Sequence, residues 1–204
     1  LSFDGAATVA RAERIIAMLS QPYTVEGNRC LIGASVGIAI SPFDGQNADE
    51  FVRNADLALY AAKNSGRGRF RFFSHDMLNV AEERRKLDED LQDALTRGEL
   101  ELLYQPVVGA ASNRVTGAEA LIRWKHPEKG MISPGHFIPI AEESSLICRI
   151  GTWILRQACE DAVKWPSSLR VAVNVSPVQF IDPSFIGNVT QALAATGLDP
   201  DRLE

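Results

Sequence analysis

The sequence lacks the cysteine pattern and the long hydrophobic runs that define several classes of protein. Its three cysteines, Cys30, Cys148 and Cys159, are odd in number, far apart and free of C-x-x-C spacing, which argues against a disulfide framework or a zinc site. We therefore expect a reducing, cytoplasmic setting. The longest apolar stretch, residues 31–40, is too short and too interrupted by Gly and Ser to cross a bilayer, so no membrane contact is expected within this sequence.

An excess of positive charge is also lacking. The 21 basic and 26 acidic residues leave a net charge of −5, which gives no general attraction to nucleic acid or anionic lipid. One basic cluster runs against this trend, at Lys63, Arg67, Arg69 and Arg71. A nucleic-acid binder built on it is a remote alternative, because few aromatic residues are interleaved as stacking platforms. With 46% hydrophobic and 23% charged residues, the chain has the composition of a folded globular protein of one or two domains.

Neither end of the sequence has the pattern of a natural terminus. The chain begins at Leu1 without a Met or a charged-then-apolar signal pattern, and it closes at Glu204 shortly after a turn signal. We expect both ends to be cut from a longer protein, whose membrane anchor, if it has one, would lie outside this sequence.

Hydrophobic periodicity divides the first half of the chain into helices and short strands. It predicts helices over residues 6–19 and 48–64, a hairpin from residues 23–25 into the run 30–40, and a closing strand over residues 69–73. Residues 75–98 then carry a sparse apolar seam among charged residues, which predicts a helical linker. A plain surface helix and a dimer-forming coil are both open for this linker, because two or three heptads are short.

After residue 98, strands alternate with helices. Strands are expected over residues 100–107, 115–124 and 169–175, and helices over residues 145–165 and 183–196. The first two strands would form a hairpin, and Asp182 would be the N-cap of the last helix. The alternation implies a parallel layout, so the predicted fold class is α/β.

One strand carries candidate chemistry. Glu119, Leu121 and Arg123 share one face of the strand over residues 115–124, because side chains alternate along a strand. A carboxylate buried between two alanines is costly unless it meets a cation, and a hard metal such as Mg²⁺ is a partner that oxygen ligands favour. An ion pair or a solvated strand edge is the alternative, since so short a pattern is not specific.

A second candidate lies at the end of the strand over residues 169–175. Asn174 is on the face opposite to the valines of that strand, at its carboxyl end, where barrel-type α/β enzymes keep their chemistry. The alternative is an Asn that starts the turn before Ser176 and Pro177.

Four motifs follow one another in order: YQP at residues 104–106, EALIRW at 119–124, FIPIAE at 137–142 and NVSP at 174–177. In order, spacing and strand placement, the last part of the chain resembles the EAL phosphodiesterase family. The resemblance implies a modified TIM-like barrel that hydrolyses cyclic di-GMP to the linear dinucleotide with Mg²⁺ or Mn²⁺.

The resemblance also assigns roles to single residues. Glu119 and Asn174 would be metal ligands. Gln105, Leu121 and Arg123 would contact the nucleotide, Arg123 through a phosphate.

The first half has its own series, with ASVGIA at residues 34–39, ADLALYAAK at 55–63 and GRGR at 66–69. It resembles the carboxyl-terminal half of a GGDEF (diguanylate cyclase) domain. Lys63 and Arg67 are one helical turn apart and could face one site near the helix end, where the resemblance implies that they bind the phosphates of GTP. A solvated basic turn is the alternative.

Other parts of the machinery would lie outside this sequence. The resemblance places further metal-binding carboxylates and the general base beyond Glu204, and the GGDEF loop before Leu1. The fragment alone is therefore expected to hold no catalytic residue of its own and to be inactive.

The predicted organisation is an α+β GGDEF remnant over residues 1–74, a helical linker over 75–98, and the first strands and helices of an EAL barrel over 99–204. The leading hypothesis is a bacterial tandem GGDEF-EAL signalling protein, homodimeric in its intact form, whose EAL domain hydrolyses cyclic di-GMP. A catalytically inactive receptor for cyclic di-GMP or GTP, and a protein that is chiefly a diguanylate cyclase, are the alternatives.

Overall fold

The computed structural model describes residues 4–204 and contains two compact units, one running to Glu83 and the other from Arg84 to Glu204. Helix α3 (Asp76–Ala94) contributes to both. No helix formed by residues 4–204 is long and apolar enough to cross a membrane. The three cysteines are free thiols.

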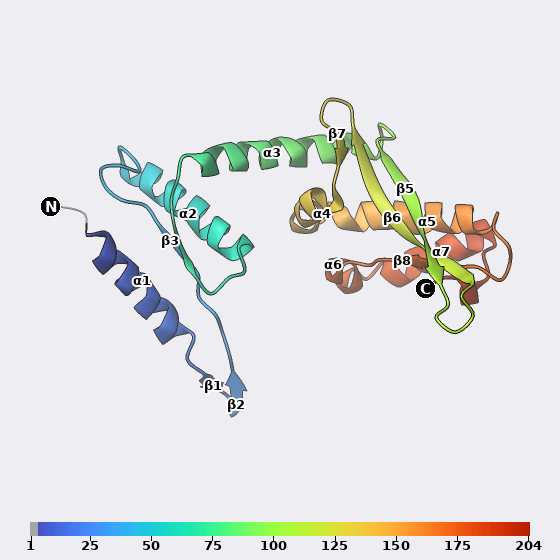
Figure 1. Ribbon diagram of the computed structural model, residues 1–204, viewed down its shortest axis with the longest axis horizontal. Helices are drawn as coiled ribbons and strands as arrows, with labels where there is room; N and C mark the ends of the chain where they lie inside the picture. The colour runs from blue at the N-terminus through green and yellow to red at the C-terminus, as the bar shows by residue number, and fades with distance from the viewer. Residues whose placement is uncertain (1–3) are drawn as a thin grey trace. The chain divides into compact units, whose positions relative to one another are not determined.

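The first unit is built from helices and separate pairs of short strands (Figure 1). In chain order these are α1 (Gly5–Leu19), β1 (Tyr23–Val25), β2 (Asn28–Cys30), β3 (Val36–Ile38), α2 (Ala48–Asn64) and β4 (Phe70–Phe72). Strands β1 and β2 form the expected antiparallel hairpin, whereas β3 pairs in parallel with β4. The single strand expected over residues 30–40 is wrong, because the two ends of this run pair with different partners.

Helix α2 packs against the β3–β4 pair through small residues. Ala58 and Ala62 are fully buried there. Gly37 of β3 allows a close approach, since a Cβ at this position would lie 2.0 Å from the carbonyl oxygen of Ala55. Any side chain at residue 37 would therefore push the helix off the strand.

The second unit consists of the end of α3 followed by a sheet and its covering helices. Its further elements are β5 (Leu100–Val108), β6 (Val115–His126), β7 (Gly130–Ile132), α4 (Pro134–Glu143), α5 (Leu146–Ala162), β8 (Arg170–Val173), α6 (Pro177–Ile181), α7 (Phe185–Thr196) and the 3-10 turn η1 (Pro200–Arg202).

Strand β6 is the centre of the sheet. Strand β5 runs antiparallel along one of its edges, as the hairpin prediction requires. The other edge pairs in parallel with β8 and, nearer its end, antiparallel with β7. Glu204 continues the parallel pattern, because its backbone nitrogen donates to the carbonyl oxygen of Val171 (2.9 Å) and its carbonyl oxygen accepts from the nitrogen of Val173 (2.9 Å).

One face of the sheet is covered by helices and the other is open. Figure 1 shows α5 and α7 running along the sheet of β5, β6 and β8. Ala120 of β6 and Val171 of β8 are buried against these helices, and the fully buried Trp124 meets the ring of Phe137 edge-on, with centroids 5.6 Å apart. The opposite face is free of helices from this core, and it carries the odd-numbered residues of β6.

The second half of α3 belongs to this core. Leu91 and Ala94 are fully buried, and Leu87 packs against the same cluster. These residues form part of the apolar seam on which a dimer-forming coil would depend. Because they already pack within their own chain, a coil could use them only by leaving this core.

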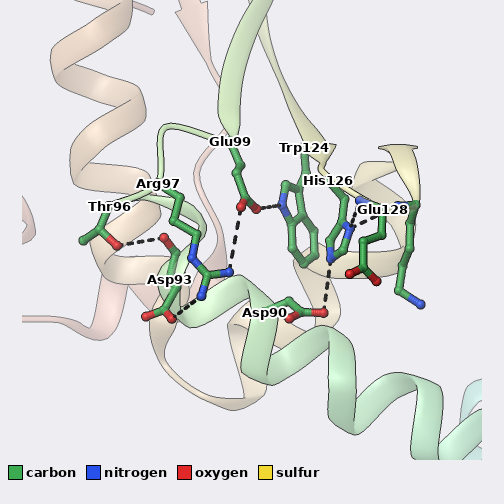
Figure 2. A network of polar contacts seen from close by, with 9 residues as sticks. Asp90, Asp93, Thr96, Arg97, Glu99, Trp124, His126 and Glu128 are labelled. Atoms are coloured by element: carbon green, nitrogen blue, oxygen red, sulfur yellow. Dashed lines mark hydrogen bonds and ion pairs between the residues drawn. The ribbon is translucent and has the colours of Figure 1, made fainter.

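Polar contacts attach the same part of α3, and the turn that follows it, to β6 (Figure 2). The Nδ1 of the buried His126 accepts from two backbone N–H groups, each at 3.1 Å, so its Nε2 carries the hydrogen and donates to Asp90 at 3.1 Å. The indole nitrogen of Trp124 donates to the carboxylate of Glu99 at 3.0 Å, and the guanidinium of Arg97 lies 3.9 Å from the same carboxylate. Strand β6 is thus fixed at the end that follows Arg123.

Tyr104 joins β5 to α5 through a hydrogen bond of 2.9 Å to Asp161. Burial, followed by this hydrogen bond, raises the pKa of Tyr104 well above its ordinary range, so the hydroxyl remains a donor. Burial alone would raise the pKa of Asp161, but hydrogen bonds from Lys164, Tyr104 and Gln157 outweigh it and lower that pKa.

Three elements have no counterpart among the sequence-based predictions: β7, α4 and α6. Helix α4 contains Pro139 in its interior, a residue that normally ends a helix. The helix expected from residue 183 begins instead at Phe185. Asp182 keeps an extended backbone, and its carboxylate accepts from the backbone nitrogen (2.9 Å) and hydroxyl (2.8 Å) of Ser184, so it caps a turn before the helix.

Candidate functional site

Glu119 and Asn174 meet across the β6–β8 pair. The side-chain Nδ2 of Asn174 donates to Oε1 of Glu119 at 2.6 Å. The parallel register places Glu119 beside Ala172, and Asn174 follows two residues later on the same side of its strand. The structure thus brings together the two residues predicted to bind metal, although 55 positions separate them in the sequence.

One of the simpler explanations, an ion pair for Glu119, does not agree with the contacts of the described residues. Glu119 is half-buried and forms no ion pair with any of residues 4–204. Ser176, rather than Asn174, is the N-cap of α6. Both side chains therefore point toward each other on the open face of the sheet.

The residues predicted to contact the nucleotide share this face. The antiparallel register sets Gln105 directly opposite Glu119, and directly opposed residues of such a pair lie on one face. Leu121 and Arg123 follow Glu119 at alternate positions of β6. The Nη1 of Arg123 donates to the carbonyl oxygen of Ile122 at 2.8 Å, which orients the guanidinium.

A cavity of about 310 Å³ opens where β8 ends. Its polar lining comes from Arg123, Glu142, Asn174, Ser176 and Gln179. A larger cavity of about 420 Å³ lies at the start of β8 and includes none of the predicted site residues in its lining. The position of the smaller cavity agrees with chemistry at the carboxyl ends of parallel strands.

Glu142 and Ser176, which line this cavity, received no role from the sequence patterns. The hydroxyl of Ser176 donates to Oε1 of Glu142 at 2.6 Å. Glu142 lies in the FIPIAE motif and Ser176 in the NVSP motif. Their place in these motifs is the feature of the sequence that could have singled them out.

Lys63 and Arg67 are both exposed and lie in the first unit. Lys63 is in the last turn of α2, which ends at Asn64. Arg67 lies beyond the helix with φ of 55°, so the two side chains are not related by a continuous helical turn as expected. The backbone nitrogen of Arg67 still donates to the carbonyl oxygen of Lys63 at 3.2 Å, which keeps the two residues close.

Comparison with protein families decides the identity of the second unit. The model of the EAL domain matches residues 88–204, more than half of the chain. The chain belongs to the EAL family. Ahead of the EAL match, residues 2–69 match the model of the diguanylate cyclase, GGDEF domain. A GGDEF stretch therefore precedes the EAL stretch, in the order that the sequence motifs predict.

Curated relatives match nearly the whole of this chain and are much longer than it. An uncharacterized signaling protein of Caulobacter vibrioides is 48% identical over 193 residues, which cover 95% of this chain and 24% of that protein. The bifunctional diguanylate cyclase/cyclic di-GMP phosphodiesterase MucR of Pseudomonas aeruginosa is 42% identical over 196 residues, which cover 94% of this chain and 29% of that protein. The chain thus spans about a quarter of the length of these two relatives.

A solved EAL structure agrees with the fold. The structure of PaMucR phosphodiesterase in complex with c-di-GMP superimposes with a TM-score of 0.56 and 41% identity, over 58% of this chain and 49% of that one. EAL domains are TIM-like barrels, so the predicted α/β fold class is confirmed.

EAL phosphodiesterases generally depend on a divalent metal ion. Among residues 4–204, no group of three or more His, Cys, Asp and Glu side chains is arranged to hold such an ion. Glu119 and Asn174 nevertheless fit one in part, with a carboxylate and an amide oxygen on adjacent strands, provided that the amide turns its Oδ1 toward the ion. Two protein oxygens supply about a third of the six ligands that a hard cation takes.

Proposed function

We propose that the EAL part of the full protein hydrolyses cyclic di-GMP to the linear dinucleotide with Mg²⁺ or Mn²⁺. The observation that carries this proposal is the 2.6 Å contact between Glu119 and Asn174, on the sheet face that also presents Gln105 and Arg123. The printed names support the substrate, since MucR is called a cyclic di-GMP phosphodiesterase and the PaMucR structure is a c-di-GMP complex.

Each residue has its own task in this proposal. Glu119 and Asn174 hold a divalent cation, which, when bound, polarises a phosphate and lowers the pKa of a bound water. Arg123 binds a phosphate through the planar fork of its guanidinium. Gln105 offers an amide to the nucleotide, and Leu121 an apolar contact between Glu119 and Arg123. The remaining metal ligands and the general base come from residues that follow Glu204.

The GGDEF stretch adds a second nucleotide-binding function to the proposal. Lys63 and Arg67 are exposed cations at the end of α2, and they bind the phosphates of GTP. Their proximity through the 3.2 Å backbone contact and the GGDEF match over residues 2–69 support this role.

The test uses the full-length protein and follows conversion of cyclic di-GMP to the linear dinucleotide by chromatography, with Mg²⁺ or Mn²⁺. Glu119→Ala should reduce turnover to background. The matched control is Glu160→Ala, which removes a carboxylate that pairs with Arg156 on the surface of α5 at 2.8 Å and should leave turnover unchanged. A parental protein that binds cyclic di-GMP but does not hydrolyse it with either metal would be a receptor and would contradict the proposal.

A further inference from the structure

The loop that presents Asn174 is fixed at its far end by Ser176. Ser176 is the N-cap of α6, and its hydroxyl accepts from the backbone nitrogen of Val178 at 3.2 Å. The Oε1 of Gln179 accepts in return from the backbone nitrogen of Ser176 at 3.1 Å. This reciprocal arrangement fixes the backbone two residues after Asn174.

Gln179 is itself held by α5. It is 4% exposed, and its amide lies directly against Gly151, where an added Cβ would be 2.0 Å from Nε2. The first turn of α6 is therefore pinned to the middle of α5.

Glu142 reaches the same point from α4. The hydroxyl of Ser176 donates to Oε1 of Glu142 at 2.6 Å, the short distance of a charge-assisted hydrogen bond. The backbone of Glu142 has little freedom, because Ala141 before it is fully buried and α4 ends at Glu143. An acidic residue in the last turn of a helix opposes the helix dipole, so the Glu142 carboxylate is stabilised by its contact with Ser176 and not by the dipole of α4.

We propose that Glu142 is a positioning residue, which acts through Ser176 to hold the 174–176 loop in the place where Asn174 meets the divalent cation. It lines the same cavity as Asn174, but the proposal gives it no direct bond to the ion. Without the Glu142 carboxylate, the Ser176 hydroxyl loses its acceptor, and the loop must be ordered when the ion binds. This inference rests on the proposed function of Glu119 and Asn174.

The experiment measures Mn²⁺ binding to the full-length protein without nucleotide, from the loss of the electron paramagnetic resonance signal of free Mn²⁺. Glu142→Ala should weaken Mn²⁺ binding about 10-fold, the lower end of what residues behind metal ligands contribute. Glu142→Gln should restore the affinity to within about threefold of the parent, because its amide oxygen still accepts from Ser176. Glu142→Asp keeps the charge but is too short to reach Ser176, so it should weaken Mn²⁺ binding about as much as Glu142→Ala. It therefore tests the proposal even if Glu142→Ala does not fold.

Two further variants separate the possible outcomes. Glu143→Ala removes the neighbouring carboxylate, which pairs with Arg84 at 2.6 Å, and should bind Mn²⁺ as the parent does. Glu119→Ala reports on the proposed function, and unchanged Mn²⁺ binding in this variant would overturn both ideas. If Glu119→Ala weakens binding while Glu142→Ala and Glu142→Asp do not, the positioning role alone is overturned. Equal losses in Glu142→Gln and Glu142→Ala would also overturn it, because the charge rather than the hydrogen bond would then matter.

Discussion

Arg123 is a cation on the open face of β6, and its guanidinium is oriented by a contact with its own strand. One N–H group donates to the carbonyl oxygen of Ile122 at 2.8 Å, and Arg123 lines the cavity at the end of β8. A planar fork held in this way suits two parallel hydrogen bonds to a phosphate, which an ammonium group cannot reproduce.

Arg123→Lys should therefore weaken binding of cyclic di-GMP to the full protein about tenfold, equivalent to about 1.4 kcal/mol. Isothermal titration calorimetry with Ca²⁺ in place of the catalytic metal would measure the dissociation constant without turnover. Arg156→Lys, on the surface of α5, is the matched control. Equal dissociation constants for the parent and Arg123→Lys would contradict this role.

The hydrogen bond between Tyr104 and Asp161 should contribute to the stability of the fold. Tyr104→Phe keeps the ring against Trp165, whose centroid is 5.0 Å away, and removes the hydroxyl that donates to Asp161. The free energy of unfolding should fall by about 1 kcal/mol, the usual net value of such a hydrogen bond. Chemical denaturation followed by tryptophan fluorescence would measure it, since Trp165 reports on this contact.

The sign of the pKa shift predicts how this loss depends on pH. The pKa of Asp161 is lowered on folding, so its stabilising contribution is complete above the ordinary carboxyl pKa of about 3.9 and disappears as pH falls through the lowered pKa. The deficit of Tyr104→Phe should thus be constant from about pH 5 to pH 9 and shrink in acid. A deficit that grew below pH 4 would refute the assignment.

At the scale of elements, the contact between α5 and α6 depends on the absence of a side chain. Gly151→Ala would place a Cβ 2.0 Å from the Nε2 of Gln179 and 2.6 Å from its Cδ. Because Gln179 is buried, it cannot simply swing aside, and the substitution should destabilise the second unit by about 1–3 kcal/mol. Gly187→Ala in α7 meets no atom within 4 Å and should be neutral or stabilising, as thermal unfolding of the two variants would show.

Elements with a strong periodic pattern were predictable from the sequence, and those with a local exception were not. Helix α2 and the β5–β6 hairpin lie where the patterns place them. Helix α4 was missed because Pro139 is a helix breaker in isolation, whereas here Phe137 and Ile140 bury the helix against the core. Tertiary packing, which the local pattern does not contain, decides this case.

The candidate site was predictable to the level of strand faces. Alternation along β6 places Glu119 and Arg123 together, but which residue of another strand lies beside Glu119 depends on strand register. The strand pattern singled out Asn174, but its role as a metal ligand beside Glu119 came from family resemblance. The hydrogen bond from Ser176 to Glu142 joins two motifs whose proximity no spacing rule indicates.

At the scale of the whole molecule, α3 is divided between the two units. Its second half is held by the buried Leu91 and by the contact between Asp90 and His126, whereas Val80 in its first half is 61% exposed. Local stability should follow this division of contacts. The predicted boundaries of the linker, at residues 74 and 98, stay a prediction, which measurement of hydrogen exchange along α3 would test.

Native-state hydrogen exchange of the full protein should show the amides of residues 88–94 protected to the level of β6 and those of residues 77–82 exchanging faster. Asp90→Ala, which removes the partner of His126, should speed exchange in the 88–94 segment while leaving residues 48–64 unchanged. Uniform protection along the whole of α3 would argue instead for one cooperative linker.

The two faces of β6 have one more consequence, for the way the protein tolerates mutation. Residues 120, 122 and 124 lie in the core, and residues 119, 121 and 123 lie on the open face. A deep mutational scan that scores protein abundance and cyclic di-GMP turnover separately should show sensitivity alternating with a period of two along this strand. Coinciding abundance and turnover profiles would argue against the division. If the two faces are divided in this way, substitutions at the odd positions can change substrate preference while the even positions keep the fold stable. One strand can then evolve a new specificity without first losing its stability.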